Sequence, residues 1–486
     1  MASDQIIEKS IKGAAWTYGA TLINALGNLI FLAVLARLLE PEVFGHFALI
    51  QVTLGFGQYL SQLGLGNALI QKEGLEKEDI ESAWALVGGL CLIVFSGFWL
   101  LAPLAADYYQ ATHLAPMIRL AALTLVLQSL AVIPLALLRR RMDYAGLAGV
   151  EVTAYLLGYG GVGILLAIYQ AGVWALIIAQ ICQYLLTAVL ATGRANCPCR
   201  PRWHTPAIRH LLSFGSRVTL ISFLEFLGAN LDVLLMGKYF PKAHIGIYNK
   251  GKMLSQLPLY YITLSLGRVL LPMYSRLNTD PHRQEAVLEK GFFLLGALII
   301  PGAAALFIFA PHLVALLLGP RWASAAPVME ICCFGSLFAL LSNPLAILCE
   351  ARARLNGKFI IQCTQLALFL GGFYAFSDQG LTGVALAFFL SQATGFALYL
   401  LLTAREFSPR PLIRAMVPSA TAAALAAMGT LAVARLPLSP AAVLPIQCLV
   451  FPGLLLLIFV SPAMEERRRL FLELVGQIRT KLIPPH

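Results

Sequence analysis

The sequence predicts an all-α integral membrane protein with about fourteen transmembrane helices. Of its 486 residues, 59% are hydrophobic and only 12% are charged, and the mean hydropathy is +0.78. Apolar stretches of about 20 residues, the length that crosses a bilayer as a helix, recur along the whole chain. Short segments of alternating polar and apolar residues, typical of an outer-membrane barrel, do not stand out, so helices are expected.

The predicted spans leave no polar block long enough for a separate soluble domain. The charged tail Met464–His486 carries apolar residues at helical spacing, which favours an amphipathic helix on the membrane surface. The spans are residues 11–36, 43–71, 82–106, 114–138, 144–169, 172–192, 210–238, 244–273, 287–311, 324–349, 357–377, 381–403, 414–434 and 441–461.

Lysine and arginine are distributed unevenly between the two sides of the predicted bundle. With the N-terminus in the cytoplasm, cytoplasmic segments hold 25 of the 35 lysines and arginines, the opposite side holds 5 and the spans hold 5. Cytoplasmic loops of membrane proteins carry such an excess. We therefore expect both termini in the cytoplasm. The net charge of +11 then reflects topology, and no nucleic-acid partner is predicted.

The N-terminus and the cysteines add two expectations. Met1–Lys12 is polar with mixed charge and the apolar segment after it is too long for a signal peptide, so no cleavable signal is expected. Most of the nine cysteines lie singly in apolar spans. Cys197 and Cys199 form the one close pair, and we expect them to be reduced in a cytoplasmic loop. No metal site is predicted.

An internal repeat with an offset of 201 residues indicates two equivalent halves. LARLLEPEVFGHF, ending at Phe47, aligns with MGKYFPKAHIGIY, ending at Tyr248. The offset contains six predicted spans, so the two halves have the same orientation and are related by a pseudo-two-fold axis along the membrane normal. We predict six-helix lobes at residues 1–209 and 210–410, and two extra transmembrane helices with a cytoplasmic amphipathic tail at 411–486.

Charged residues are concentrated in two neighbouring spans at the start of the second half. A charge at membrane depth costs at least about 2.5–3.5 kcal/mol on insertion scales, so such residues face a polar cavity or a partner. Structural ion pairs among them are the alternative to a functional site. The six residues are Arg217, Glu225, Asp232, Lys250, Lys252 and Arg268.

Helical spacing groups these charges. Glu225 and Asp232 are expected on one face, within about 20° of each other. Lys250 and Arg268 also share a face, whereas Lys252 points nearly opposite to Lys250.

The first half carries a polar lining without charge at the equivalent place. Two stripes, each following the helical period, lie on its first two spans. We predict that they face the same water-filled cavity as the charged pair. Hydrogen bonding between helices, worth about 0.6 kcal/mol per bond, is the alternative. The stripes are Thr17, Thr21, Asn24 and Asn28 on the first span, and Gln51, Gln58 and Gln62 on the second.

Four segments in order resemble signatures of the Wzx-type polysaccharide flippases. They are GLGNALIQ (Gly64–Gln71), ALLRRRMDY (Ala136–Tyr144), NLDVLLMGKYF…GIYNKGKML (Asn230–Leu254) and VLLPMYSRL (Val269–Leu277). These flippases form the PST branch of the multidrug/oligosaccharidyl-lipid/polysaccharide (MOP) superfamily. The colanic-acid or lipopolysaccharide-biosynthesis subgroup fits best, and the resemblance covers roughly residues 10–405.

The resemblance implies a MATE/MOP-like fold and a transport function. Such proteins move an undecaprenyl-diphosphate-linked oligosaccharide from the cytoplasmic to the periplasmic leaflet of the bacterial inner membrane by alternating access. It implies no cofactor, with H⁺ or Na⁺ as coupling-ion candidates. The implied partners, besides this substrate and membrane lipids, are a polysaccharide polymerase and export machinery. The motif aspartate maps to Asp232 and the tyrosine after the turn maps to Tyr248.

The charges themselves suggest how such a substrate would be held. Cations in a wet cavity replace the lost hydration of a diphosphate. We expect Arg217 and Arg268 to bind the diphosphate or the first sugars, with Lys250 and Lys252 nearer the exit. Asn24, Asn28, Gln51, Gln58 and Tyr248 complete the predicted substrate-binding set. Glu225 and Asp232 are predicted to bind a coupling ion or to balance charge.

Three other functions stay open at this point. A MATE-like multidrug exporter would need an acidic and aromatic cavity, whereas the charged pair of spans carries four cations and two acids. A lipid II flippase shares the predicted span number and a cationic cavity. A membrane polysaccharide polymerase or ligase would need catalytic groups on sizeable external loops, and those predicted here are short and lack a carboxylate pair. No catalytic residue is predicted.

Overall fold

The structure is a computed structural model. It describes residues 19, 23–72, 74–197, 200–204, 223–257, 274, 281–352, 354–404, 407–434 and 440–460. Within these ranges the regular elements are all helical and none is a strand. Nine of the described helices are long and apolar enough to cross a membrane, and each overlaps a predicted span. The chain is therefore a multi-pass helical membrane protein, while the predicted number of fourteen spans stays a prediction.

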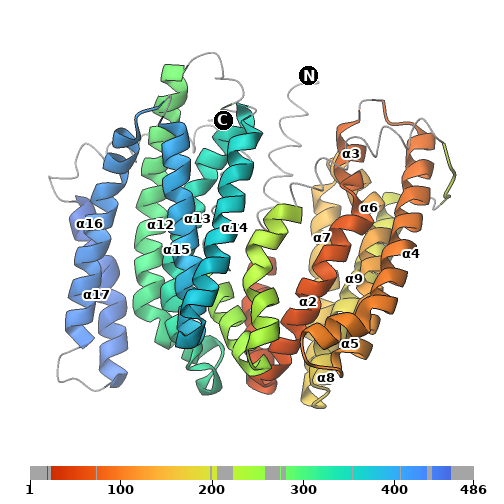
Figure 1. Cartoon of the computed structure of the whole chain (residues 1–486), viewed down its shortest axis with the longest axis horizontal. Helices are drawn as coiled ribbons and strands as arrows, with labels where there is room; N and C mark the ends of the chain where they lie inside the picture. Colours follow the sequence, from red (N-terminus) through yellow and green to blue (C-terminus); the bar gives the residue numbers. More distant parts are fainter. Residues whose placement is uncertain are drawn as a thin grey trace. The chain divides into compact units, whose positions relative to one another are not determined.

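The helices form two compact units, coloured by sequence in Figure 1. Unit 1 comprises Met1–Asn249 and Ala315–Trp322, and unit 2 comprises Lys250–Val314 and Ala323–His486. The boundary falls inside the helix 242–257. The predicted lobes 1–209 and 210–410 and the segment 411–486 stay a prediction.

Unit 1 contains most of the first half of the chain. Apolar side chains of α3, α4 and α6 form its core, with Leu69, Val87 and Ile133 fully buried. α9 packs along α6, α7 and η1. The elements are the helix Ile23–Leu38, α2 (Pro41–Gln62), α3 (Leu65–Gln71), α4 (Lys77–Tyr108), α5 (Leu114–Ala121), α6 (Leu123–Arg140), α7 (Tyr144–Tyr155), the π-helix η1 (Leu156–Gly163), α8 (Ile164–Ile168), α9 (Val173–Ala195), the helix 223–239 and the short 3-10 helix η2 (Pro320–Trp322).

Unit 2 contains α12 (Pro281–Leu317), α13 (Ala325–Ala351), α14 (Leu355–Phe376), the 3-10 helix η3 (Ser377–Gln379), α15 (Leu381–Thr403), α16 (Pro409–Ala434) and α17 (Pro440–Val460), although α12 ends in unit 1. α15 packs against both α13 and α14, and Phe292 of α12 stacks on Phe396 of α15 with ring centroids 6.5 Å apart.

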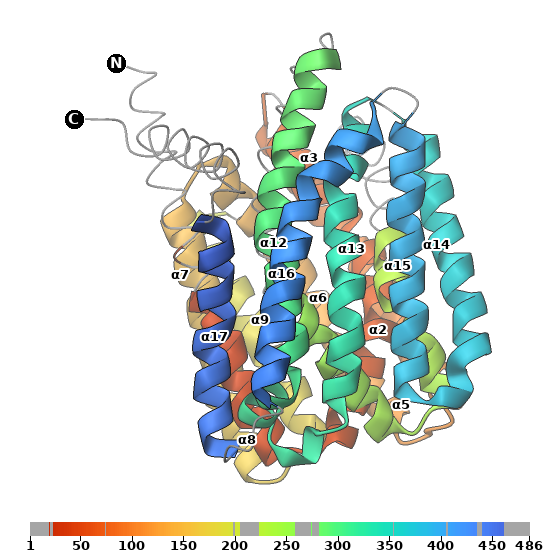
Figure 2. The same ribbon diagram turned by 90° about the vertical axis from the view of Figure 1, so that its left-hand side faces the viewer.

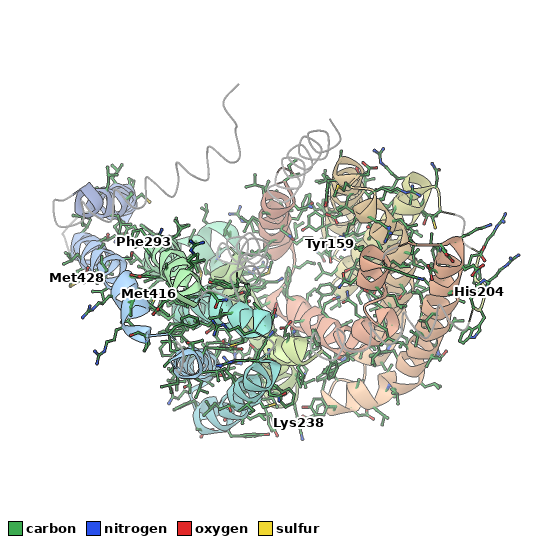
Figure 3. All side chains as sticks on the ribbon, turned by 90° about the horizontal axis from the view of Figure 1, so that it is seen from above. Tyr159, His204, Lys238, Phe293, Met416 and Met428 are labelled. Atoms are coloured by element: carbon green, nitrogen blue, oxygen red, sulfur yellow. The ribbon has the colours of Figure 1, made fainter. Side chains whose placement is uncertain are left out.

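The last two helices attach to unit 2 as a pair. α16 and α17 lie side by side in Figures 1 and 2. Buried Ile308 of α12 packs with Ala426 of α16 and Phe451 of α17. Met416 of α16, labelled in Figure 3, packs against α12, where a Cβ on Gly296 would lie 3.3 Å from Met416 Cγ.

The second predicted span, 43–71, is interrupted in the structure. α2 ends at Gln62 and α3 begins at Leu65. Between them, Leu63 and Gly64 have positive φ angles of 40° and 62°. Helix periodicity alone could not show this break because the residues around it are apolar. Glycine reaches the left-handed region without the steric cost of a Cβ, which makes the turn possible at Gly64.

The two copies of the internal repeat meet at their glycines. A Cβ on Gly45 of α2 would lie 1.8 Å from the carbonyl oxygen of Lys242, and a Cβ on Gly246 would lie 1.9 Å from that of Pro41. Both contacts join positions that the 201-residue offset relates, since it pairs Gly45 with Gly246 and Pro41 with Lys242. The two helix starts therefore cross backbone to backbone around a local two-fold relationship inside unit 1.

The ends of the repeated hairpins are fixed by hydrogen bonds to their last carbonyls. Trp322 Nε1 donates to the carbonyl of Ala36 at 2.9 Å. At the equivalent position, Lys242 Nζ donates to the carbonyl of Gly237 at 2.8 Å and to that of Tyr109 at 2.6 Å. The offset of 201 also relates Ala36 to Gly237. In each copy of the repeat, therefore, a side chain hydrogen-bonds a carbonyl at the end of the first helix.

Candidate functional site

The structure brings Asp232 and Tyr248, two residues mapped from the family motifs, into direct contact. The chain reverses at Pro241 between the helices 223–239 and 242–257, which places the two side chains opposite each other. Tyr248 is fully buried and Asp232 is 3% exposed. The Tyr248 hydroxyl donates to Asp232 Oδ2 at 2.8 Å, and the backbone N–H of Val233 donates to Oδ1 at 2.8 Å. Both carboxylate oxygens thus accept hydrogen bonds, as a buried carboxylate requires.

Glu225 has different surroundings from Asp232, although the helical period places both on one face. Its side chain is exposed, whereas Asp232 is buried. The residue after it, Phe226, packs edge-on against Phe56 of α2 with ring centroids 5.4 Å apart. The two acids are therefore one buried and one accessible group on the same helix.

Lys250 and Lys252 point to different neighbours within unit 2. Lys252 is 7% exposed, and its Nζ lies 4.9 Å from the ring centroid of Phe388 in α15. Lys250 is half-buried, and its Nζ lies 3.8 Å from Met253 Sδ. A cation over an aromatic ring gains about 0.5–2 kcal/mol, which offsets part of the cost of burial. Lys252 is therefore a buried cation held against an aromatic ring, and Lys250 is the more accessible of the two cations.

The amides of the first half form contacts between helices. The side chains of Gln51 in α2 and Gln180 in α9 exchange two hydrogen bonds, of 2.5 and 3.0 Å. The hydroxyl of Tyr155 in α7 donates to Asn28 Oδ1. Asn28 and Gln51 thus form hydrogen bonds between helices, and their predicted role in substrate binding stays a prediction.

The other two predicted amides have different environments. Gln58 is exposed. Asn24 Oδ1 is buried and accepts no hydrogen bond from any residue that the structure describes. Arg217, Arg268, Thr17 and Thr21 lie outside the described residues, so their predicted roles stay predictions.

Sequence reasoning missed Tyr155 as the partner of Asn28 and Gln180 as the partner of Gln51. Tyr155 begins a run rich in glycine and tyrosine, YLLGYGGVG, that could have drawn attention. No local pattern pairs Gln51 with Gln180, which is 129 residues away.

The motif Ala136–Tyr144 holds helix ends together rather than presenting free cations. Arg140 Nη1 donates to the carbonyls of Leu69, Ile70 and Lys72 at 2.9, 3.2 and 2.6 Å, which completes the C-terminal end of α3. Arg141 Nη1 donates to the carbonyl of Ala195, at the end of α9, at 2.7 Å. Such last-turn carbonyls otherwise lack partners.

Asp143, the aspartate of the motif Ala136–Tyr144, connects the same helix ends. Asp143 caps α7 by accepting from the backbone N–H of Gly146 at 2.9 Å, and it accepts from Arg194 Nε at 2.9 Å. The hydrogen bond from Arg194, followed by that from Gly146, lowers the pKa of the Asp143 carboxyl. A Cβ on Gly146 would lie 2.1 Å from Arg194 Nε and 2.4 Å from Asp143 Oδ2, so a larger residue there would displace these two side chains.

Comparison with solved structures identifies the fold. A lipid II flippase MurJ in an inward closed conformation superimposes with a TM-score of 0.73 at 13% identity, covering 91% of this chain and 97% of that one. An inward-facing multidrug resistance MATE transporter of the MOP superfamily gives 0.63 at 14% identity, covering 78% and 93%. The predicted MATE/MOP-like helical fold is confirmed.

Comparison with known sequences identifies relatives. The lipopolysaccharide biosynthesis protein WzxC of Escherichia coli (strain K12) is 26% identical over 399 residues, 79% of each chain. The teichuronic acid biosynthesis protein TuaB of Bacillus subtilis (strain 168) is 21% identical over 402 residues, 80% of this chain and 81% of the relative. The succinoglycan biosynthesis transport protein ExoT of Rhizobium meliloti (strain 1021) is 25% identical over 304 residues, 61% and 60%.

The family match agrees with the motifs that the sequence carries. Residues 34–327, more than half of the chain, match the family described as polysaccharide biosynthesis protein. This chain therefore belongs to the polysaccharide biosynthesis protein family.

Proposed function

We propose that this protein is a flippase that moves an undecaprenyl-diphosphate-linked oligosaccharide from the cytoplasmic to the periplasmic leaflet by alternating access. The observation that carries the proposal is a combination: a member of a polysaccharide biosynthesis family has the helical fold of a lipid II flippase over 91% of its length. The names of its relatives supply the substrate class, since each is assigned to the biosynthesis of a polysaccharide and one is a transport protein.

The lysines of the helix 242–257 support an anionic substrate. A diphosphate needs fixed cations to replace its hydration inside a membrane. Lys250, half-buried, is the described cation that we assign to the head group, with Arg217 and Arg268 as its predicted partners. Lys252, fixed over Phe388, adds positive potential from within unit 2.

The carboxylates complete the proposed mechanism. Asp232, buried with Tyr248, and Glu225, exposed on the same helix, either bind a coupling ion, H⁺ or Na⁺, or balance the cations. The lysine-rich and arginine-rich loops support placing both termini in the cytoplasm and the protein in the bacterial inner membrane. A polysaccharide polymerase and export machinery would then take over the translocated product.

The proposal is tested by following the substrate in a deletion strain. Lipid-linked oligosaccharide is expected to accumulate in the cytoplasmic leaflet, which membrane-impermeant periodate reaches only in everted vesicles. The wild-type gene is expected to restore surface polysaccharide. Lys250→Gln is expected to fail in this restoration, while the exposed Lys290→Gln serves as the matched control. Full surface polysaccharide in the deletion strain would exclude the proposed substrate.

A MATE-like drug exporter is the main competing function because it shares the fold. It would handle organic cations, whose binding four lysine and arginine residues in the predicted cavity would oppose. Unchanged drug susceptibility of the deletion strain is expected. Increased susceptibility to cationic drugs together with normal polysaccharide would support the exporter instead.

A further inference from the structure

Tyrosines and amides from four helical segments form one connected group in the middle of unit 1. We call it the tyrosine–amide belt. Its members come from the helix Ile23–Leu38, from α2, from the α7–η1 segment and from α9. They are Asn28, Gln51, Tyr155, Tyr159 and Gln180.

The first part of the belt follows the π-helix. Tyr155 donates its hydroxyl hydrogen bond to Asn28. Its ring lies 5.6 Å from that of Phe31 on one side and 5.3 Å from that of Tyr159 on the other, measured between centroids. Three aromatic rings therefore run in a row beside an amide.

The second part crosses to α9 and α2. Next to Tyr159, which is labelled in Figure 3, a Cβ on Gly158 would lie 2.9 Å from the carbonyl oxygen of Ala179, the residue before Gln180 in α9. Gln180 exchanges two hydrogen bonds with Gln51. The belt thus runs from Asn28 to Gln51 across the contact between η1 and α9.

The belt lies at the middle of its helices. Tyr155 lies eleven residues after the start and thirteen before the end of the span Tyr144–Ile168. Gln51 is likewise central in α2. Tyrosine in membrane proteins favours the two interfaces, where its hydroxyl reaches water. A half-buried tyrosine at mid-depth, hydrogen-bonded to an amide, is therefore a feature that lipid contact does not explain.

Glycines of the π-helix bring the neighbouring helices close to the belt. A Cβ on Gly160 would lie 2.6 Å from the ring of Phe31, and one on Gly158 would lie 2.9 Å from the carbonyl of Ala179 in α9. π-helical turns are rare and occur frequently at functional sites. This one presents Tyr155 and Tyr159 between two closely approaching helices.

We propose that the tyrosine–amide belt binds the uncharged sugar rings of the lipid-linked substrate, and this inference rests on the proposed flippase function. None of the five residues carries a formal charge. Amides both donate and accept, which suits sugar hydroxyls, and tyrosine offers an apolar ring face with a polar end. Asn24, one helical turn before Asn28, adds a buried acceptor with no partner among the described residues. The belt is thus assigned to the glycan of the substrate and not to its diphosphate.

Two probes separate these contributions in equilibrium binding to the purified full-length protein in nanodiscs. One is undecaprenyl diphosphate without sugar. The other is the undecaprenyl-diphosphate-linked oligosaccharide extracted from the deletion strain. Tyr159→Leu is expected to weaken binding of the sugar-bearing probe about tenfold and to leave the Kd for the sugar-free probe unchanged. Tyr169→Leu, at a tyrosine that is 75% exposed, is the matched control.

Two further variants keep the test independent of folding. Tyr159→Phe retains the ring and is expected to bind both probes nearly as the wild type does. Asn24→Leu removes the buried Oδ1 acceptor without breaking any described hydrogen bond. This variant is expected to weaken binding of the sugar-bearing probe only.

The outcomes distinguish the inference from the proposed function. The inference is wrong if the wild type binds both probes equally. It is also wrong if Tyr159→Leu and Asn24→Leu leave binding of both probes unchanged, or weaken binding of both probes to the same extent. The belt then only holds helices together. If the wild type binds neither probe, the proposed flippase function itself fails.

Discussion

Gly45 and Gly246, which are 201 residues apart in the sequence, each pack against the backbone of the other's helix. Any Cβ at either position would lie within 2 Å of a carbonyl oxygen, a distance that real contacts do not reach. Backbone atoms cannot rotate away as a side chain can, so the two helix starts would have to separate.

Gly45→Ala and Gly246→Ala are therefore expected to destabilise unit 1 by similar amounts, about 1–3 kcal/mol each. Thermal unfolding of the purified protein in detergent measures this. Gly88→Ala in α4, where no atom lies within 4 Å of the added methyl group, is the control and should unfold near the wild-type temperature. Unequal losses at the two glycines would contradict their equivalence.

Tyr248→Phe removes one donor from the buried Asp232 carboxylate while keeping the ring. Loss of a hydrogen bond to a buried charged group costs about 1–3 kcal/mol, so a lower unfolding temperature is expected. Tyr169→Phe at the exposed tyrosine is the control. In a double-mutant cycle with Asp232→Asn, the two changes should be less than additive, and full additivity would show that the contact contributes nothing.

Asp143 gives the protein a pH-dependent contribution on its arginine-rich side. Its pKa is lowered from the ordinary value of 3.8 by Arg194, so the stabilisation is present above 3.8 and is lost as the pH falls through the lowered pKa. Arg194 is 52% exposed, so screening by solvent keeps the contribution of the pair small. Asp143→Asn is expected to be slightly less stable at neutral pH, and its difference from the wild type should shrink below pH 3.8. Unfolding at several pH values checks this, with the exposed Asp378→Asn as the control.

Gly158 and Gly161 lie in the same π-helix but have different surroundings. A methyl group at Gly158 would meet Gln183 Cβ at 2.7 Å and the α9 backbone, whereas at Gly161 nothing lies within 4 Å. Gly158→Ala is expected to push α9 away, lowering both the unfolding temperature and restoration of surface polysaccharide. Gly161→Ala should be neutral or slightly stabilising, because alanine restricts the unfolded chain. Equal behaviour of the two variants would mean that η1 does not pack as described.

The positions of the spans could be predicted because burial in a bilayer demands long apolar helices, and the sequence states that length directly. The opposite directions of Lys250 and Lys252 follow from the helical period alone, and their different neighbours, Met253 and Phe388, agree with it. The equivalence of Gly45 and Gly246 could be predicted from the repeat. Their contact could not, because an alignment relates positions in the sequence and says nothing of whether they meet in space.

The partners of the amides could not be predicted. Gln51 meets Gln180 through the packing of α2 and α9, and no local pattern encodes that pairing. The accessible Glu225 and the buried Asp232 have one periodicity and two environments, because burial depends on where along the helix a neighbour packs. The interruption at Leu63 and Gly64 was hidden for a related reason: an apolar glycine run is compatible with both a continuous helix and a turn.

The short segment Ala315–Trp322 has a consequence for biosynthesis. It belongs to the first compact unit, where Trp322 is fully buried and hydrogen-bonds Ala36, yet 65 residues of the other unit are translated before it. Domains ordinarily fold in the order in which they leave the ribosome. Here the amino-terminal unit cannot complete its packing until Ala315–Trp322 has been synthesised, which happens only after the second unit has begun to leave the ribosome.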